Sequence, residues 1–326
     1  MKTFTSFLVA IICVLLAVTS FAGSGAPGST LSFADTAYTE TPLALKTNTG
    51  DISGSLTLPT GTNKGIVALI IAGSGPTDRD GNNPVMTNNS LKMLAEALAA
   101  SGIASLRYDK RGIGQSASAM KKEEDLRFED YVNDAKGWIE LLKKDKRFKK
   151  IVIIGHSEGS LIGLLAASNA DKFVSIAGPG QSADKVIKDQ LHAQSQEIQN
   201  MTFPLIDSLK NGYKVTNPSP KLASLFRASV QQYLISWFAY DPSDQIKKLT
   251  IPVLIIQGTN DIQVSVSEAK LLSGANPNAT LILVDKMNHV FKLAEADPQL
   301  NLKTYNDPAL PLVPEFVTAV IVFILK

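Results

Sequence analysis

The sequence predicts an α/β fold in which a mostly parallel central sheet is covered by helices on both faces. Short, continuous apolar runs are typical of strands that are buried on both faces. Helical segments separate these runs, and this alternation implies parallel strands joined by crossover helices. With 326 residues, 44% of them hydrophobic, the chain suits one enzyme-sized domain with a large core. The apolar runs are Gly65–Ala72, Ile103–Tyr108, Ile151–Ile154, Phe173–Ala177, Pro252–Ile256 and Leu281–Val284.

The first residues have the pattern of a secretory signal. Lys2 supplies the positive start, Phe7–Val18 the apolar core, and Ser20-Phe21-Ala22 the small residues before cleavage at Gly23. An uncleaved membrane anchor is the alternative, but the apolar stretch is shorter than the roughly 20 residues that a span needs. We therefore predict a signal peptide, residues 1–22, and export to the periplasm or the extracellular space.

Charge and cysteine content exclude several classes of partner. The formal net charge is only +2 and long basic runs are absent from the sequence, so neither nucleic acid nor an anionic membrane surface is expected to bind. The single cysteine, Cys13, lies inside the signal segment. The mature chain should therefore have no disulfide and no cysteine metal ligand.

The chain divides into a core and one insertion. A leader segment, residues 23–42, precedes an antiparallel hairpin of Leu43–Lys46 and Ile52–Leu58. The core should comprise residues 43–180 and 251–326. Residues 181–250 interrupt the alternation, read as mostly helical, and predict a helical lid. Apolar residues in this insertion recur at helical spacing and either dock it on the core or form an acyl-binding wall, or do both. They are Leu222, Leu225, Phe226, Val230, Tyr233, Leu234, Trp237 and Phe238.

The clearest core helices should cover the sheet. The run at the C-terminus is strongly apolar but too short to span a membrane, so we expect a buried terminal helix and no integral span in the mature chain. The predicted helices are Leu91–Ala100, Phe128–Leu142, Ser267–Leu272 and Phe316–Leu325.

The candidate nucleophile is Ser157, which lies in Gly155-His156-Ser157-Glu158-Gly159 directly behind a buried strand. A G-x-S-x-G sequence in this position favours a sharp strand-to-helix turn that exposes the serine hydroxyl. Such a turn crowds the residues two before and two after the serine, which is why glycine suits both positions. The pattern is short enough to occur by chance, so its context must supply a base, an acid and an oxyanion site.

The candidate general base is His289, one of three histidines in the sequence. His156 is adjacent to Ser157 and cannot meet its neighbour's hydroxyl with good geometry, and His192 lies on a polar stretch of the insertion. His289 follows a predicted strand, so its ring can reach the sheet edge at which Ser157 lies.

A carboxylate must orient this imidazole, and Asp261 and Asp285 both follow predicted strands. We favour Asp261, because it gives the chain order serine, aspartate, histidine that accompanies a nucleophile elbow. Asp285 shares a short loop with His289 and would have to bend back to meet it.

Two backbone N–H groups should form the oxyanion hole. One is the Glu158 amide at the start of a helix, and the other is the Ser74 amide in the loop Ala72-Gly73-Ser74-Gly75-Pro76. An ordinary glycine turn is the alternative for that loop.

Two further patterns look like binding motifs and are not. Asp78-Arg79-Asp80-Gly81 lacks the ligands of a calcium loop, and we expect Arg79 to brace the loop through an ion pair. Residues 112–117 contain G-x-G-x-x-A, but these glycines follow a charged turn and no acidic residue ends a strand about twenty positions later. They predict a structural turn beside the site and no dinucleotide.

These features together resemble the alpha/beta-hydrolase superfamily, in particular bacterial carboxylesterases of the serine-aminopeptidase-like branch. The resemblance covers Leu43–Lys326 and depends on the elbow, on residues 73–81 and on Tyr-Asp-Lys-Arg-Gly-Ile-Gly-Gln-Ser at 108–116. It implies an alpha/beta-hydrolase fold with an inserted helical lid. The usual histidine-glycine pair before the oxyanion loop is Ala72-Gly73 here.

The resemblance also implies Ser157, Asp261 and His289 as a catalytic triad that hydrolyses small-molecule esters of short to medium acyl length through an acyl-enzyme, with no cofactor and no metal. A serine aminopeptidase, amidase or thioesterase on the same triad is the alternative, and a non-catalytic exported binding protein is a third. A peptidase acting on free N-termini needs an acid in the insertion to hold the amine. Asp184, Asp189, Glu197, Asp207, Asp241 and Asp244 are available. No oligomeric state is predicted.

Overall fold

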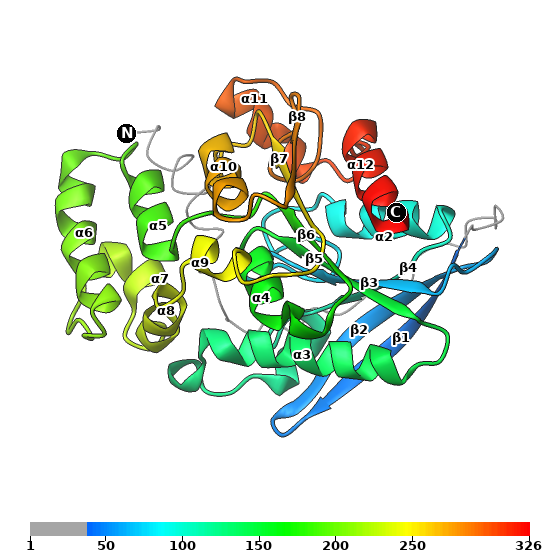
Figure 1. Ribbon diagram of the computed structural model, residues 1–326. Coiled ribbons are helices and arrows are strands. Elements are labelled where there is room, and N and C mark those ends of the chain that lie inside the picture. The colour runs from blue at the N-terminus through cyan, green and yellow to red at the C-terminus, as the bar shows by residue number, and fades with distance from the viewer. Residues whose placement is uncertain (1–37) are drawn as a thin grey trace, which may run out of the picture.

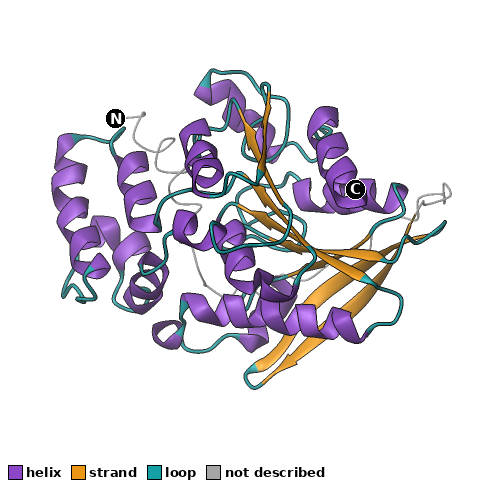
Figure 2. Ribbon diagram, in the orientation of Figure 1, coloured by secondary structure: helices purple, strands orange, loops and turns teal. Residues whose placement is uncertain are grey.

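The computed structural model describes residues 38–326, in which one eight-stranded sheet lies between two layers of helices (Figures 1 and 2). The predicted signal peptide and the leader up to residue 37 lie outside the described residues. Each predicted apolar run forms a strand within the sheet order β1-β2-β4-β3-β5-β6-β7-β8. The strands are β1 Tyr38–Thr47, β2 Gly50–Pro59, β3 Ile66–Ile71, β4 Ala104–Tyr108, β5 Lys150–His156, β6 Lys172–Ile176, β7 Val253–Gly258 and β8 Thr280–Val284.

The strand directions confirm a mostly parallel sheet. Neighbours from β4 to β8 run parallel, whereas β1 pairs antiparallel with β2, and β2 antiparallel with β4. The central strands β3 and β5 are almost completely buried, as continuous apolar runs predict.

The first strand is longer than the sequence predicted. β1 begins at Tyr38 rather than at Leu43, and the added residues extend its pairing with β2 up to Tyr38 opposite Pro59. Most of these added residues are exposed on an edge strand, so they carry no apolar alternation. An edge strand also tolerates Pro42, which has no backbone N–H to donate.

Helices cover the sheet on both faces. α3, α4 and α10 pack on one face, and α2 and α12 on the other, each layer with its own apolar core (Figure 1). Among the described residues no helix is long and apolar enough to cross a membrane. The core helices are α2 Ser90–Ala100, α3 Phe128–Lys144, α4 Glu158–Ala166, α10 Val266–Ala275, α11 Pro298–Lys303 and α12 Pro314–Leu325.

The segment between β6 and β7 is helical and lies at one end of the molecule (Figure 1). Its apolar residues are buried, but they do not form one continuous helical face, because Arg227 adopts an extended conformation and separates α7 from α8. The insertion docks on α3, where the Phe128 and Trp237 rings stack with centroids 6.0 Å apart. Its helices are α5 Ala183–Leu191, α6 Gln196–Lys210, α7 Ala223–Phe226, α8 Gln231–Phe238 and α9 Pro242–Ile246.

The strand order creates a crevice between β3 and β5. From β3 the chain crosses through α2 to β4 on one side, then returns through α3 to β5 on the other side of β3. The chain leaves β3 toward one side of the sheet and leaves β5 toward the other side. The loops after these two strands therefore diverge, and the crevice between them is where open α/β sheets bind ligands. The loop that contains Ser74 and the turn that contains Ser157 line the two sides of this crevice.

The turn after β5 packs against the end of β3 with no room for a side chain. A Cβ on Gly159 would lie 2.3 Å from the Ile71 carbonyl oxygen, and one on Gly155 would lie 2.4 Å from the Gly159 oxygen. Both contacts are shorter than real Cβ contacts, so the sequence-based argument for glycine at these two positions is confirmed.

Gly159→Ala should therefore destabilise the fold by about 1–3 kcal/mol, because the added methyl group forces α4 away from β3. The matched control is Gly274→Ala in α10, where a Cβ meets nothing within 4 Å. That change should raise stability by up to about 1 kcal/mol through helix propensity. Equilibrium unfolding in urea measures both, and equal stability of the Gly159 variant and wild type would refute the steric argument.

Candidate active site

Ser157 lies at the crevice in a strained backbone conformation. Its φ of 55° and ψ of −122° are unusual for a residue with a side chain, and its neighbours on both sides are buried while Ser157 itself is partly exposed. The Ser157 N–H donates to the Ile176 carbonyl of β6, at 3.0 Å. This is the sharp turn that the G-x-S-x-G pattern predicted, and it presents the hydroxyl at the carboxyl edge of the sheet.

His289 and Asp261 form a hydrogen-bonded pair at the same edge. His289 Nδ1 lies 2.8 Å from Asp261 Oδ2, and both side chains are almost fully buried. A carboxylate oxygen only accepts, so Nδ1 donates in this contact, and in the neutral imidazole Nε2 is then the acceptor. His289, Ser157 and Ser74 line one cavity. The structure thus brings together the three side chains proposed as the triad.

Both oxygens of the Asp261 carboxylate accept two hydrogen bonds each. Its Oδ1 accepts from the N–H groups of Gln263 and Val264, at 2.8 and 2.9 Å, and its Oδ2 accepts from the Gln257 amide as well as from His289. The competing residue Asp285 is bonded instead to Thr259, at 3.3 Å, in an exposed position. Only Asp261 therefore fixes the imidazole.

The two proposed oxyanion donors lie beside Ser157. Ser74 and Glu158 line the same cavity as the serine, and an added Cβ on the preceding Gly73 would lie 3.1 Å from the Ser157 Cβ. Neither the Ser74 nor the Glu158 N–H has an acceptor among residues 38–326. Free N–H groups beside the hydroxyl are what a developing oxyanion requires.

The loop that carries Ser74 is braced as predicted. Arg79 binds Asp109 through its side chain and its backbone N–H, with the closest ion-pair contact at 2.8 Å, and both side chains are buried. Asp109 follows β4 and also accepts from the Gln115 N–H at 2.9 Å. This pair joins the two motif loops. Gly112 and Gly114 both have positive φ, and Gly114 opens only a short 3-10 helix, Gly114–Ala119, as a structural turn would.

His156 has a role that the sequence did not indicate. Its Nε2 donates to the carbonyl oxygen of His289 at 3.0 Å, and the two rings lie 4.7 Å apart. Burial, and then the nearby His289 ring, lower the pKa of His156 well below its usual value. His156 is therefore neutral and holds the backbone of His289. Adjacency to Ser157 in the sequence gave no sign of this contact.

Asn288 is a second residue that sequence reasoning missed. Its Oδ1 accepts from the N–H groups of Val290 and Lys292, at 3.1 and 3.0 Å, and its amide donates to Asn301 at 3.1 Å. It is buried and closes the loop around His289. Within residues 38–326 no cluster of three or more His, Cys, Asp or Glu side chains could hold a metal ion.

Two cavities beside Ser157 differ in character. The first is lined mainly by apolar residues of α4, the insertion and the loop after β7, namely Leu161, Ala183, Val186, Ile187, Trp237 and Val264. The second includes His289 and is lined by polar residues of the loop after β3, among them Thr77, Asn83 and Asn88. We name them the apolar cavity and the polar cavity.

Comparisons with known proteins show an alpha/beta-hydrolase fold. Residues 87–233 match the family described as serine aminopeptidase, S33.

Esterase EstD of Thermotoga maritima is 27% identical over 248 residues, which cover 73% of this chain and 58% of EstD. The chain thus spans little more than half the length of this relative.

Solved structures share the fold at low sequence identity. The Pyrococcus furiosus esterase PF2001 is 18% identical, with a TM-score of 0.57 and coverage of 95% of this chain and 97% of its own. Est1E from Butyrivibrio proteoclasticus, solved with ferulic acid bound, is 19% identical, with a TM-score of 0.58 and coverage of 87% and 100%.

The neutral, buried His156 predicts a loss of stability in acid. The unfolded chain binds a proton at this position below its ordinary pKa of about 6.5, whereas the folded chain does not. The free energy of unfolding should therefore fall as the pH drops below 6.5, by up to about 1.4 kcal/mol per pH unit from this group. His289 and Lys110 are the charged or titratable groups that oppose its protonation.

His156→Gln keeps a donor near the same place and removes the titration, so its stability should depend less on pH between 6.5 and 5. His192→Gln, whose ring is exposed at the end of α5, is the control and should behave as wild type. Unfolding at a series of pH values measures the slopes. Identical slopes for the His156 variant and wild type would contradict the assignment.

Proposed function

We propose that this protein is a carboxylic ester hydrolase that uses Ser157 as nucleophile, His289 as general base and acid, and Asp261 as the orienting carboxylate. The convergence of a partly exposed, strained serine, a buried histidine-aspartate pair and two free N–H groups carries the proposal. The esterase relatives of the same fold support it.

In the first half of the reaction, Ser157 Oγ attacks the ester carbonyl carbon and its proton passes to His289 Nε2. The carbonyl oxygen becomes an oxyanion that accepts from the Ser74 and Glu158 N–H groups. The C–O bond to the alcohol then breaks, and the leaving oxygen takes the proton from His289. In the second half, water attacks the acyl-enzyme, His289 takes its proton and returns it to Ser157 Oγ, and the carboxylic acid leaves.

We assign the alcohol and acyl parts of the ester to different cavities. The leaving oxygen must face His289, so the alcohol belongs in the polar cavity that His289 lines. The acyl chain then occupies the apolar cavity, where Leu161, Ile187 and Trp237 can cover it. The apolar residues of the insertion thus serve both as a docking face and as part of an acyl wall, and they favour short to medium acyl chains.

The carboxylates of the insertion favour an ester over a free N-terminus as substrate. None of the six available acids lines the apolar cavity, and each is engaged by another side chain within the described part of the chain. The pairs are Asp184 with Lys210, Asp189 with Gln181, Glu197 with Lys221, Asp207 with Lys188, Asp241 with Lys185 and Asp244 with Lys247.

Hydrolysis of a p-nitrophenyl acyl series tests the function. Activity should be greatest for short to medium chains and should fall by several orders of magnitude in Ser157→Ala and His289→Ala, as loss of a triad member does. Greater kcat/KM on aminoacyl amides than on any ester would overturn the ester assignment in favour of a peptidase.

The apolar cavity gives a sharper test with a matched pair on α5. Val186→Phe narrows the cavity and should shift the preferred acyl chain to a shorter one, whereas the exposed neighbour Lys185→Ala should leave the preference unchanged. An unchanged optimum in the Val186 variant would place the acyl chain elsewhere.

We also propose that the protein is exported. The support is the sequence of residues 1–22, with Lys2, the apolar core Phe7–Val18 and small residues before Gly23. Mass spectrometry of the protein recovered outside the cytoplasm should find Gly23 as the first residue. An N-terminus at Met1 would refute cleavage.

A further inference from the structure

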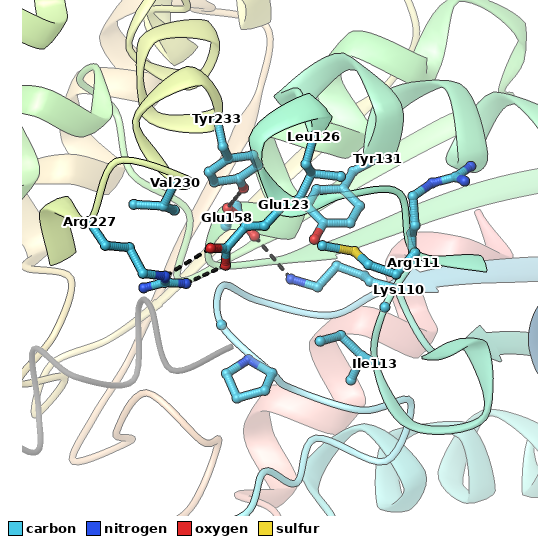
Figure 3. Close-up of a pocket in the computed structure, with 14 residues that line it drawn as sticks. Lys110, Arg111, Ile113, Glu123, Leu126, Tyr131, Glu158, Arg227, Val230 and Tyr233 are labelled. Atoms are coloured by element: carbon cyan, nitrogen blue, oxygen red, sulfur yellow. Dashed lines mark hydrogen bonds and ion pairs between the residues drawn. The ribbon is translucent and has the colours of Figure 1, made fainter. Parts of the chain in front are cut away.

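Lys110 is a buried cation that the proposed mechanism does not use. It follows β4 in the charged turn at 108–111, and its side chain is 1% exposed. Its ammonium group donates to the carbonyl oxygen of Gly73. It also lies 3.0 Å from Glu158 Oε2, with the Tyr131 ring 5.2 Å away (Figure 3). Burial of a lone ammonium is costly, so these partners must stabilise it. Of these partners, Gly73 and Glu158 flank the oxyanion hole.

The contact with Gly73 determines where the next N–H group points. The described chain has no cis peptide bond, so the Gly73–Ser74 peptide is trans, with its C=O and N–H on opposite sides. Because Lys110 holds the carbonyl on one side, the Ser74 N–H is directed to the other side. Ser74 lines both cavities at Ser157. Lys110 therefore sets the orientation of one oxyanion donor.

The contact with Glu158 acts on the second donor. Glu158 is the first residue of α4, and its carboxylate lies between Lys110 and the Tyr233 hydroxyl of α8 (Figure 3). Burial and the Glu158 charge hold the pKa of Tyr233 well above its usual value, so the phenol stays protonated and donates. The side chain of Glu158 is thus fixed from the core and from the insertion, and its N–H is held with it.

We propose that Lys110 is a positioning residue, which through Gly73 and Glu158 holds the two N–H groups of the oxyanion hole in place for the transition state. The inference deepens the proposed function and rests on it. Tyr233 extends the same network to the helical insertion, so that the docking of α8 supports the oxyanion site.

The test separates positioning from stability with three variants. Lys110→Met removes the donor to Gly73 but leaves the Glu158 carboxylate buried without its cation, so this variant should be unstable as well as slow. Lys110→Met/Glu158→Gln removes both charges, which should restore much of the stability. Lys172→Met is the matched control, because Lys172 also donates to backbone carbonyls, at 2.8 and 3.2 Å, but at the start of β6, the opposite sheet edge from Ser157.

Active sites are first counted by titration with a fluorophosphonate, and kcat and KM are then measured per titrated site. The double variant should lose about 100-fold in kcat, the effect of an oxyanion donor, with KM within about threefold of wild type. Its rate of phosphonylation at Ser157 should fall in parallel. Lys172→Met should retain the wild-type kcat per site.

Recovery of the double variant's kcat together with its thermal stability would overturn the proposal, because Lys110 would then be only structural. If wild type is phosphonylated at Ser157 but hydrolyses no ester, the ester assignment fails while the phosphonylation rates still decide the role of Lys110. Equal rates for the double variant and wild type in that case would refute it.

Discussion

The close approach of α4 to the end of β3 is the constraint on which the site depends. Gly159 lies against the carbonyl oxygen of Ile71, and no other residue allows this approach without displacement of the helix. It brings the turn at Ser157 against the loop at Gly73, so nucleophile and oxyanion loop meet at the point where the strand connections diverge. The strained backbone of Ser157 is maintained by the same packing.

Several buried polar groups surround this contact, and each has a partner that follows a different strand. Asp261 and His289 follow β7 and β8, Lys110 and Asp109 follow β4, and Glu158 follows β5. Removal of one member leaves the other buried and unpaired, which is more destabilising than loss of both. This physical coupling makes the loops a rigid frame, and electrostatic stabilisation of a transition state requires donors that do not reorganise.

The sequence predicted the fold and the site for identifiable reasons. Continuous apolar runs are required of strands buried on both faces, and all six became strands. The glycines at 155 and 159 indicated the tight turn at Ser157. Because the sequence has only three histidines, few candidates existed for the general base. The exposed start of β1 and the break between α7 and α8 were missed, because edge residues carry no apolar pattern and the spacing of buried residues does not show where a helix stops.

The chemistry available at each strand end thus follows directly from residue type and order: a serine at a glycine-flanked turn, an aspartate, then a histidine. Which of these side chains meet depends on the tertiary packing. In the folded protein Asp261, rather than Asp285, accepts a hydrogen bond from His289. His156 donates to the carbonyl oxygen of His289. Lys110 contacts both Gly73 and Glu158. These contacts link residues far apart in the chain, and their geometry arises from sheet register and packing, which no local pattern encodes.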